Sequence, residues 1–206
     1  MSRRFGYLAL AAFVLSALVH VLTFFPRAAI VGGAVWLLHV GLFVFWFPMV
    51  ILGSLWQYRL CNRLLGSGDY ESRSRARTDA AWRMVRLVPF AARCVVVFLF
   101  AYTFVNFALF VAQGDAGTAS AVDGQYFLYE RGVRSSITER EYVRIRSRQV
   151  RGFSGHWMLF YFVPALFFIH VLPGVRREVR RVGVEDPGPP NRRLQPGEGA
   201  ERETEE

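Results

Sequence analysis

A chain of 206 residues that is 53% hydrophobic and 16% aromatic is more apolar than an ordinary soluble domain. Its formal charge of +9 comes from 25 arginines without a single lysine, and these arginines flank apolar segments. Lipid headgroups account for such a pattern better than nucleic acid does. The two cysteines, Cys61 and Cys94, form no C-x-x-C motif, which argues against a zinc or dithiol site.

Four long apolar segments predict an all-α membrane protein built as a four-helix transmembrane bundle. A span needs roughly 20 mostly apolar residues, and we expect spans at about residues 7–25, 28–52, 87–112 and 153–172. The first apolar run is longer than that of a signal peptide and lacks a small-x-small cleavage site, which indicates a retained anchor. Residues 1–184 thus form one transmembrane domain, and the polar residues 185–206 predict a disordered tail.

The loop at residues 53–86 reads as helix, turn, helix. Residues 55–60 prolong the second span, Gly66-Ser67-Gly68-Asp69 interrupts it, and residues 78–86 lead into the third. The short link Pro26-Arg27 predicts a tight hairpin of the first two spans. Kinks of three spans are expected at prolines: Pro48, Pro89 and Pro164.

The loop at residues 113–152 predicts a small extracytoplasmic hairpin-plus-helix element between spans three and four. Residues 113–123 read as a small-residue linker, followed by a strand at 125–129 and a return strand at 133–137. Thr138-x-x-Glu141 matches a capping box and opens a helix that reaches about Val150. Four arginines share one face of that helix, where we expect them to attract anionic lipid or an acidic partner unless the face is merely solvated: Arg140, Arg144, Arg148 and Arg151.

The distribution of arginines predicts the orientation. With the N-terminus inside, 16 arginines lie on the cytoplasmic side and 8 outside, as the positive-inside rule favours. We therefore expect a multi-pass protein of the cell (inner) membrane with both termini in the cytoplasm. The absence of lysine is typical of a GC-rich genome and suggests a bacterial origin.

Polar side chains within spans are costly, so they mark interhelical contacts or sites. His20 and Asn106 each lie roughly 8–9 Å below the outer surface, which allows a hydrogen bond between them. Tyr102 is a further polar contact, and Arg93 lies close enough to the end of its span to reach the interface.

His39 and His170 have comparable predicted depths and could ligate a haem from facing helices. In span count and in the use of membrane histidines the chain resembles small four-helix membrane cytochromes of the b type, a resemblance of architecture without a shared motif. It implies haem b as a cofactor. Helix–helix hydrogen bonding is the simpler expectation for both histidines.

Gly152-Phe153-Ser154-Gly155 resembles the G-x-S-G motif of rhomboid proteases. The resemblance implies a serine nucleophile, but that family has a six-span core, whereas four spans are predicted here. We favour a structural interpretation, in which this stretch is a flexible start of the fourth span. Ser154 then caps the helix and Trp157 anchors it at the interface.

The sequence favours a small membrane protein that acts by binding or structural support and not by catalysis. The alternatives are haem-based electron transfer through His39 and His170, and transport by an oligomer. Its expected partners are membrane lipids and a second membrane protein or further copies of itself; nucleic acid is not expected.

Overall fold

A computed structural model describes residues 2–25, 33–65, 70–112 and 117–184. Within these residues, four helical segments are long and apolar enough to cross a membrane: Arg3–Leu22, Gly33–Arg63, Phe90–Ala112 and Glu139–Arg181. The chain is therefore a multi-pass membrane protein. The predicted link at 26–27, the first residues of the predicted second span, the interruption at 66–69 and the tail at 185–206 lie outside the described residues.

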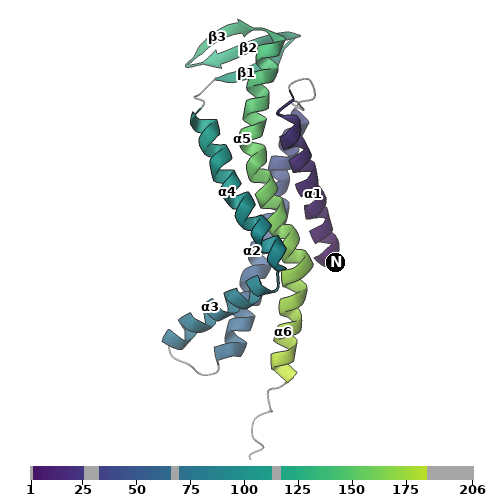
Figure 1. The fold of residues 1–206 in the computed structure, drawn as a ribbon, viewed down its shortest axis with the longest axis vertical. Helices are drawn as coiled ribbons and strands as arrows, with labels where there is room; N and C mark the ends of the chain where they lie inside the picture. The colour runs from purple at the N-terminus through teal and green to yellow at the C-terminus, as the bar shows by residue number, and fades with distance from the viewer. Residues whose placement is uncertain (1, 26–32, 66–69, 113–116, 185–206) are drawn as a thin grey trace, which may run out of the picture.

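One long helical rod forms the axis of the fold (Figure 1). Helix α5 (Glu139–Leu166) continues into the π-helix η2 (Phe167–Val171) and then into α6 (Leu172–Val184). Pro164 lies inside α5, and the wider π-helical turn follows it. The predicted span at 153–172 is thus the middle of a longer helix. We call the two ends of the molecule the sheet end and the α6 end.

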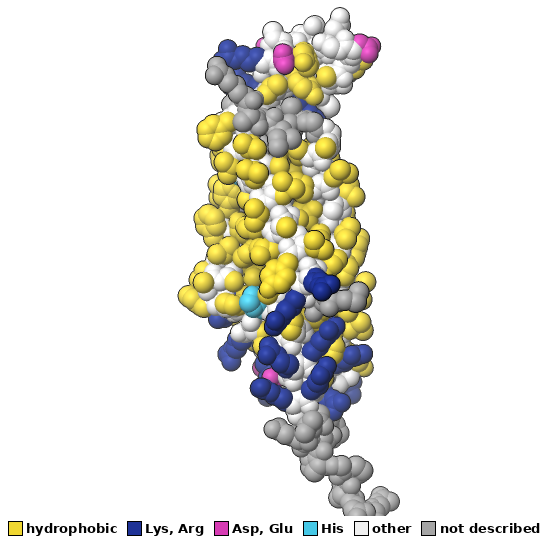
Figure 2. All heavy atoms as spheres, turned by 90° about the vertical axis from the view of Figure 1, so that its right-hand side faces the viewer, with side chains coloured by type: hydrophobic (Ala, Val, Ile, Leu, Met, Phe, Trp, Pro, Cys, Tyr) yellow, Lys and Arg dark blue, Asp and Glu magenta, His cyan; other side chains and the backbone are white. Residues whose placement is uncertain are grey.

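Three other helices pack against this rod: α1 (Ser2–Leu22), α4 (Phe90–Ala112), and α2 (Trp36–Leu65), which follows the short helix η1 (Gly33–Val35). The bundle buries Trp157 and Tyr161 of α5 almost completely. Its outward faces carry many exposed aliphatic and aromatic side chains. Figure 2 shows them as a long apolar belt, with arginines gathered beyond it at the α6 end. This distribution is that of a protein solvated by lipid.

At the α6 end, α3 (Tyr70–Arg86) packs with the last turns of α2 and with α6 around a small core that includes Leu60, Ala80 and Val175. An ion pair of 3.3 Å joins Arg83 of α3 to Glu178 of α6. The chain turns at residues 87–89, so the third span begins at Phe90. The predicted proline kink at Pro89 is therefore wrong, because Pro89 precedes the helix.

At the sheet end lies a three-stranded antiparallel sheet in the order β1 (Thr118–Val122), β2 (Gln125–Glu130), β3 (Val133–Ile137). The predicted hairpin is β2–β3 and is confirmed. The interpretation of residues 113–123 as a linker is wrong for 118–122, which form β1 on the free side of β2. The sheet contacts α5, whose Tyr142 ring lies 4.9 Å from that of Tyr126.

Two-residue turns join the strands. Asp123 and Gly124 have φ values of 50° and 76°, and Arg131 and Gly132 have values of 47° and 82°. Two successive positive φ angles produce the twist that a tight hairpin needs, and glycine adopts them without strain. The capping box of α5 is also confirmed, because the backbone N–H of Thr138 donates to Oε2 of Glu141 at 2.8 Å and the Glu141 N–H donates to Oγ1 of Thr138 at 3.3 Å.

The glycines of the Gly152-Phe153-Ser154-Gly155 stretch lie in the interior of α5. The predicted flexible start of the span and the N-cap role of Ser154 are therefore wrong. A methyl group added at Gly155 would lie 2.5 Å from Nδ2 of Asn106, and one added at Gly152 would lie 2.7 Å from the Phe110 ring. The glycines are thus the surface on which α4 approaches α5.

Candidate functional site

A buried polar network joins α1, α4 and α5 in the half of the bundle nearest the sheet. Nδ1 of His20 lies 2.8 Å from Oγ of Ser154, and its Nε2 lies 2.5 Å from the hydroxyl of Tyr102. His20 is 4% exposed and Ser154 is fully buried. Both ring nitrogens of the histidine are therefore satisfied by neighbouring helices, as a polar group in an apolar bundle requires.

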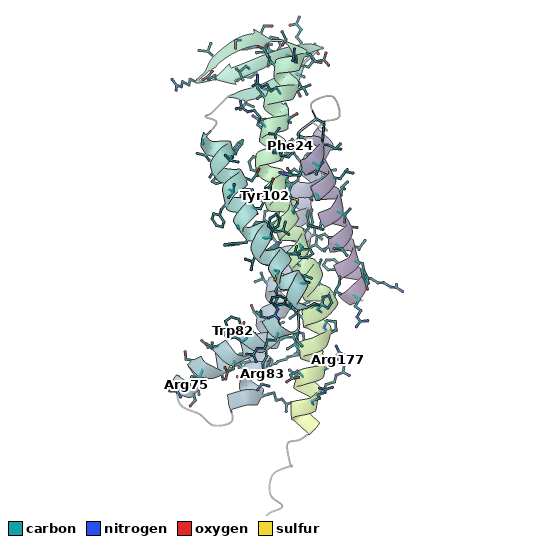
Figure 3. The ribbon with its side chains drawn as sticks, viewed as in Figure 1. Phe24, Arg75, Trp82, Arg83, Tyr102 and Arg177 are labelled. Atoms are coloured by element: carbon teal, nitrogen blue, oxygen red, sulfur yellow. The ribbon has the colours of Figure 1, made fainter. Side chains whose placement is uncertain are left out.

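Arg151 closes the network at the end of α1. Its Nη2 donates to the carbonyl of Thr23 at 2.8 Å and its Nε donates to Oγ1 of the same residue at 3.2 Å. Its guanidinium also lies 4.2 Å from the Phe24 ring, and Figure 3 shows Phe24 at this end of α1 and Tyr102 on α4. A cation is favourable at a helix C-terminus because the last carbonyl groups of the helix accept no hydrogen bond from within it.

The four arginines of the predicted basic face differ in their surroundings. Arg140 and Arg144 are exposed, whereas Arg148 and Arg151 are half-buried. Arg151 turns into the bundle towards α1. The outer two are therefore the residues available to a lipid or partner surface.

Asn106 lies next to the network but does not bond to His20. Its Nδ2 donates to the carbonyls of Arg151 and Gly152, each at 3.0 Å. Thr103, one turn away on α4, donates to the carbonyl of Gly155 at 3.3 Å. His20 and Asn106, which were predicted to bond to each other, both lie at the level of Ser154. Each of them instead forms a hydrogen bond with α5.

The Ser154–His20 contact has the composition of a hydrolytic pair but not its surroundings. Ser154 is fully buried and sits inside α5, where backbone N–H groups are bonded within the helix. A serine nucleophile needs substrate access and free N–H donors for the developing oxyanion. The geometry therefore assigns these side chains to helix packing.

Arg93 lies three residues into α4, nearer the end of its span than predicted. Its guanidinium is 5.6 Å from the Phe90 ring, and its Nε is buried without a hydrogen-bond partner. The guanidinium thus lies near Phe90, the first residue of α4, and that Arg93 reaches the interface stays a prediction.

The structure does not bring His39 and His170 together. Nε1 of Trp157 donates to Nδ1 of His39 at 3.0 Å, which places His39 at the level of Trp157. His170 lies thirteen residues further along the same helical rod, a separation of roughly 20 Å at the helical rise. Two axial ligands of one iron must be only about 4 Å apart, since each metal–nitrogen bond is about 2 Å.

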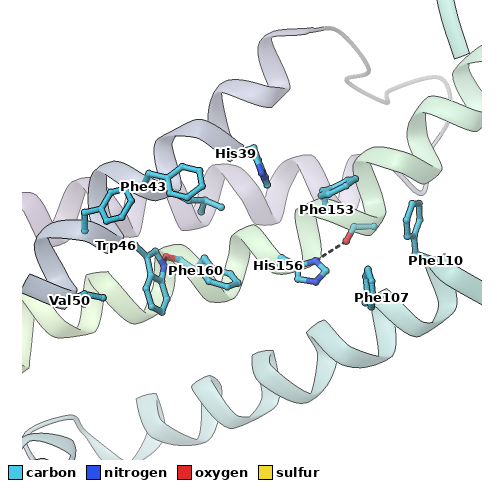
Figure 4. A pocket seen from close by; sticks show the side chains of 12 residues that line it. His39, Phe43, Trp46, Val50, Phe107, Phe110, Phe153, His156 and Phe160 are labelled. Atoms are coloured by element: carbon cyan, nitrogen blue, oxygen red, sulfur yellow. Dashed lines mark hydrogen bonds between the residues drawn. The ribbon is translucent and has the colours of Figure 1, made fainter. Parts of the chain in front are cut away.

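A second feature is a cleft between α2 and α4, with α5 as its floor (Figure 4). It has a volume of about 520 Å³. Its residues belong to three helices, six on α2, two on α4 and four on α5: His39, Leu42, Phe43, Trp46, Phe47, Val50, Phe107, Phe110, Gly152, Phe153, His156 and Phe160. The lining surface is almost entirely apolar.

Hydrogen bonds hold the α2 wall of the cleft against its floor. Trp46 donates from Nε1 to the carbonyl of Phe160 at 2.7 Å, and the hydroxyl of Tyr161 donates to the carbonyl of Leu38. Gly41 makes room for that hydroxyl, since a methyl group there would lie 2.5 Å from it. With the Trp157–His39 bond, these contacts fix α2 on α5, and His39 and Trp46 belong at the same time to the lining of the cleft.

His156 lies within the cleft floor and belongs to no recognisable sequence motif. Its Nδ1 donates to the carbonyl of Gly152 at 3.0 Å, one turn earlier in α5. Its ring packs edge-on against Phe107 with the ring centres 5.5 Å apart. Figure 4 shows His39 and His156 on different walls of the same space, among phenylalanine side chains.

Comparison with models of protein families, with curated proteins and with solved structures finds no match to this chain. The function must therefore be inferred from the site itself.

Proposed function

We propose that the protein is a binding component of the membrane and that the cleft between α2 and α4 receives the hydrocarbon chain of a lipid. The observation that carries the proposal is an apolar space of about 520 Å³ whose walls are packed in place and whose side opens between two helices. A cleft of this kind cannot be filled by water without cost, so an apolar occupant is favoured in a bilayer.

The length of the cleft supports a lipid chain. The lining residues of α2 run from His39 to Val50, a distance of about 16 Å at the helical rise. One leaflet of the hydrocarbon core is about 15 Å thick. Seven of the twelve lining residues are Phe or Trp. Their flat rings can pack against the side of a flexible hydrocarbon chain.

The orientation that we propose has the sheet end on the extracytoplasmic side of the cell membrane and both termini in the cytoplasm. The arginines beyond the apolar belt at the α6 end support it, because basic residues favour the cytoplasmic side. Anionic lipid and other copies of the chain are the partners that such a surface would meet.

Retention of lipid by cleft-filling variants tests the proposal. Val50→Trp would fill the cleft, and Val44→Trp adds the same ring at an exposed position of α2 that does not line it. After extensive detergent washing, native mass spectrometry should show bound lipid on the wild-type protein and on Val44→Trp, with several-fold less on Val50→Trp. Equal retention by the two variants would refute the proposed site.

A further inference from the structure

A second cleft lies further along α2, towards the α6 end. It lies between α2 and α3, has a volume of about 520 Å³, and is lined by Ser54, Gln57, Tyr58, Cys61, Asn62, Arg73 and Arg77. About half of its lining surface is polar, whereas the lining of the first cleft is almost entirely apolar. Of the described residues that line it, two are cationic and none is acidic.

The residues of α2 that line the two clefts follow one another along the helix. The apolar cleft is lined by His39, Leu42, Phe43, Trp46, Phe47 and Val50, and the α2 residues of the polar cleft follow from Ser54 to Asn62. Val50, the last α2 residue of the apolar cleft, and Ser54, the first of the polar cleft, are one helical turn apart. Along α2 the apolar cleft is therefore followed by a polar one.

Two features of α3 fit a polar cleft at the level of lipid headgroups. Helix α3 runs away from the bundle axis at the α6 end (Figure 1) and carries Trp82, which is 59% exposed. An exposed tryptophan at this level is typical of the membrane interface. Arg73 and Arg77 are one turn apart on α3, so their guanidinium groups can reach one anion.

We infer that the ligand of the two clefts is a phospholipid with an anionic head. This inference rests on the proposed function. The hydrocarbon chain occupies the cleft between α2 and α4, and the phosphate lies between Arg73 and Arg77, with Gln57 and Tyr58 as neutral hydrogen-bond donors. Guanidinium groups bind phosphate oxygens with well-defined geometry, and the change from apolar to polar lining matches the change from chain to head.

The test uses the purified full-length protein, stripped of lipid and then offered defined probes. These are phosphatidylglycerol, a diacylglycerol with the same chains, and inorganic phosphate. Arg73→Gln with Arg77→Gln removes the proposed anion site. Arg63→Gln with Arg86→Gln removes the same charge from α2 and α3 at positions that do not line the cleft. Binding is measured by native mass spectrometry.

The wild-type protein and the control pair should bind phosphatidylglycerol equally, and the Arg73/Arg77 variant should bind it on the order of tenfold more weakly. Diacylglycerol should bind more weakly than phosphatidylglycerol. Its binding should not change with either pair of arginine substitutions. Equal binding of phosphatidylglycerol by both arginine variants would overturn the assignment of the head. So would binding of inorganic phosphate alone to Arg73 and Arg77 as tightly as the lipid, because it would identify a soluble anion as the ligand.

Failure of this inference can be separated from failure of the proposed function. If the arginine variants behave alike while Val50→Trp still excludes diacylglycerol, the chain site stands and only the head is wrongly assigned. If Val50→Trp excludes neither lipid, both fail.

Discussion

Nδ1 of His20 and Oγ of Ser154 lie 2.8 Å apart although 134 residues separate them in the chain. The contact joins α1 to the long helical rod. The other ring nitrogen of His20, Nε2, is hydrogen-bonded to the Tyr102 hydroxyl, which joins α4 to the same group. One imidazole thus connects three of the four helical segments that, among the described residues, are long enough to span a membrane. Such contacts orient helices that apolar packing alone would leave free to rotate, because lipid is as apolar as the helix faces.

Ser154→Ala should destabilise the bundle by about 1 kcal/mol, because it removes an interhelical bond and leaves a nitrogen of His20 unpaired. Ser16→Ala is a matched control. Ser16 is also fully buried, but its hydroxyl donates to the carbonyl of Ala12 in its own helix. Reversible unfolding in mixed micelles measures both free energies. If the two variants lose equal stability, the interhelical bond contributes nothing.

Gly155→Ala should cost about 1–3 kcal/mol, because its methyl group would displace the Asn106 amide and the two bonds it makes to α5. Gly53→Ala should be neutral or slightly stabilising, since the nearest atom to its methyl group would be 3.5 Å away and alanine favours a helix. A double-mutant cycle with Asn106→Ala should show coupling. An additive cycle would show that the clash is not with Asn106.

The purified protein should be colourless, without a Soret band, even from haem-replete cells. The reason is the separation of roughly 20 Å between the levels of His39 and His170 along the rod. Absorbance before and after dithionite is the measurement. A Soret band lost in both His39→Ala and His170→Ala, but kept in His20→Ala, would show that the helices adopt another arrangement.

Labelling from one side of the membrane tests the orientation. With Cys61 and Cys94 replaced by serine, a membrane-impermeant maleimide should label Ser135→Cys in intact cells. It should label Asn191→Cys in the tail only after permeabilisation. The reverse pattern would invert the topology and place the sheet in the cytoplasm.

Composition and periodicity were sufficient to predict much of the fold. The apolar segments, the β2–β3 hairpin and the capping box at Thr138 are local features, and all are present. Strand β1 was missed because its residues 118–122 are mostly small and become a strand through pairing with β2. The Asp123-Gly124 pair was the available signal, since this dipeptide favours tight hairpin turns.

The sites could be predicted less well, because they depend on which helices are neighbours. Helical rise placed His20 and Asn106 at a shared level, yet it could not show that each of them bonds to α5 and not to the other. The stretch from Gly152 to Gly155 suggested flexibility, whereas the close approach of α4 gives those glycines a packing role. A cleft between α2 and α4 depends on how far apart the two helices lie. No local sequence pattern determines that separation.

The most direct test of the chain-binding cleft is cross-linking by a phospholipid with a photoactivatable group in its acyl chain. Excess lipid is washed from the loaded protein before irradiation, and tandem mass spectrometry then locates the adducts. We predict adducts on cleft residues such as Phe43, Trp46 and Phe107. Adducts confined to outward-facing residues such as Phe100 and Phe104 of α4, or spread evenly over all exposed faces, would contradict the account.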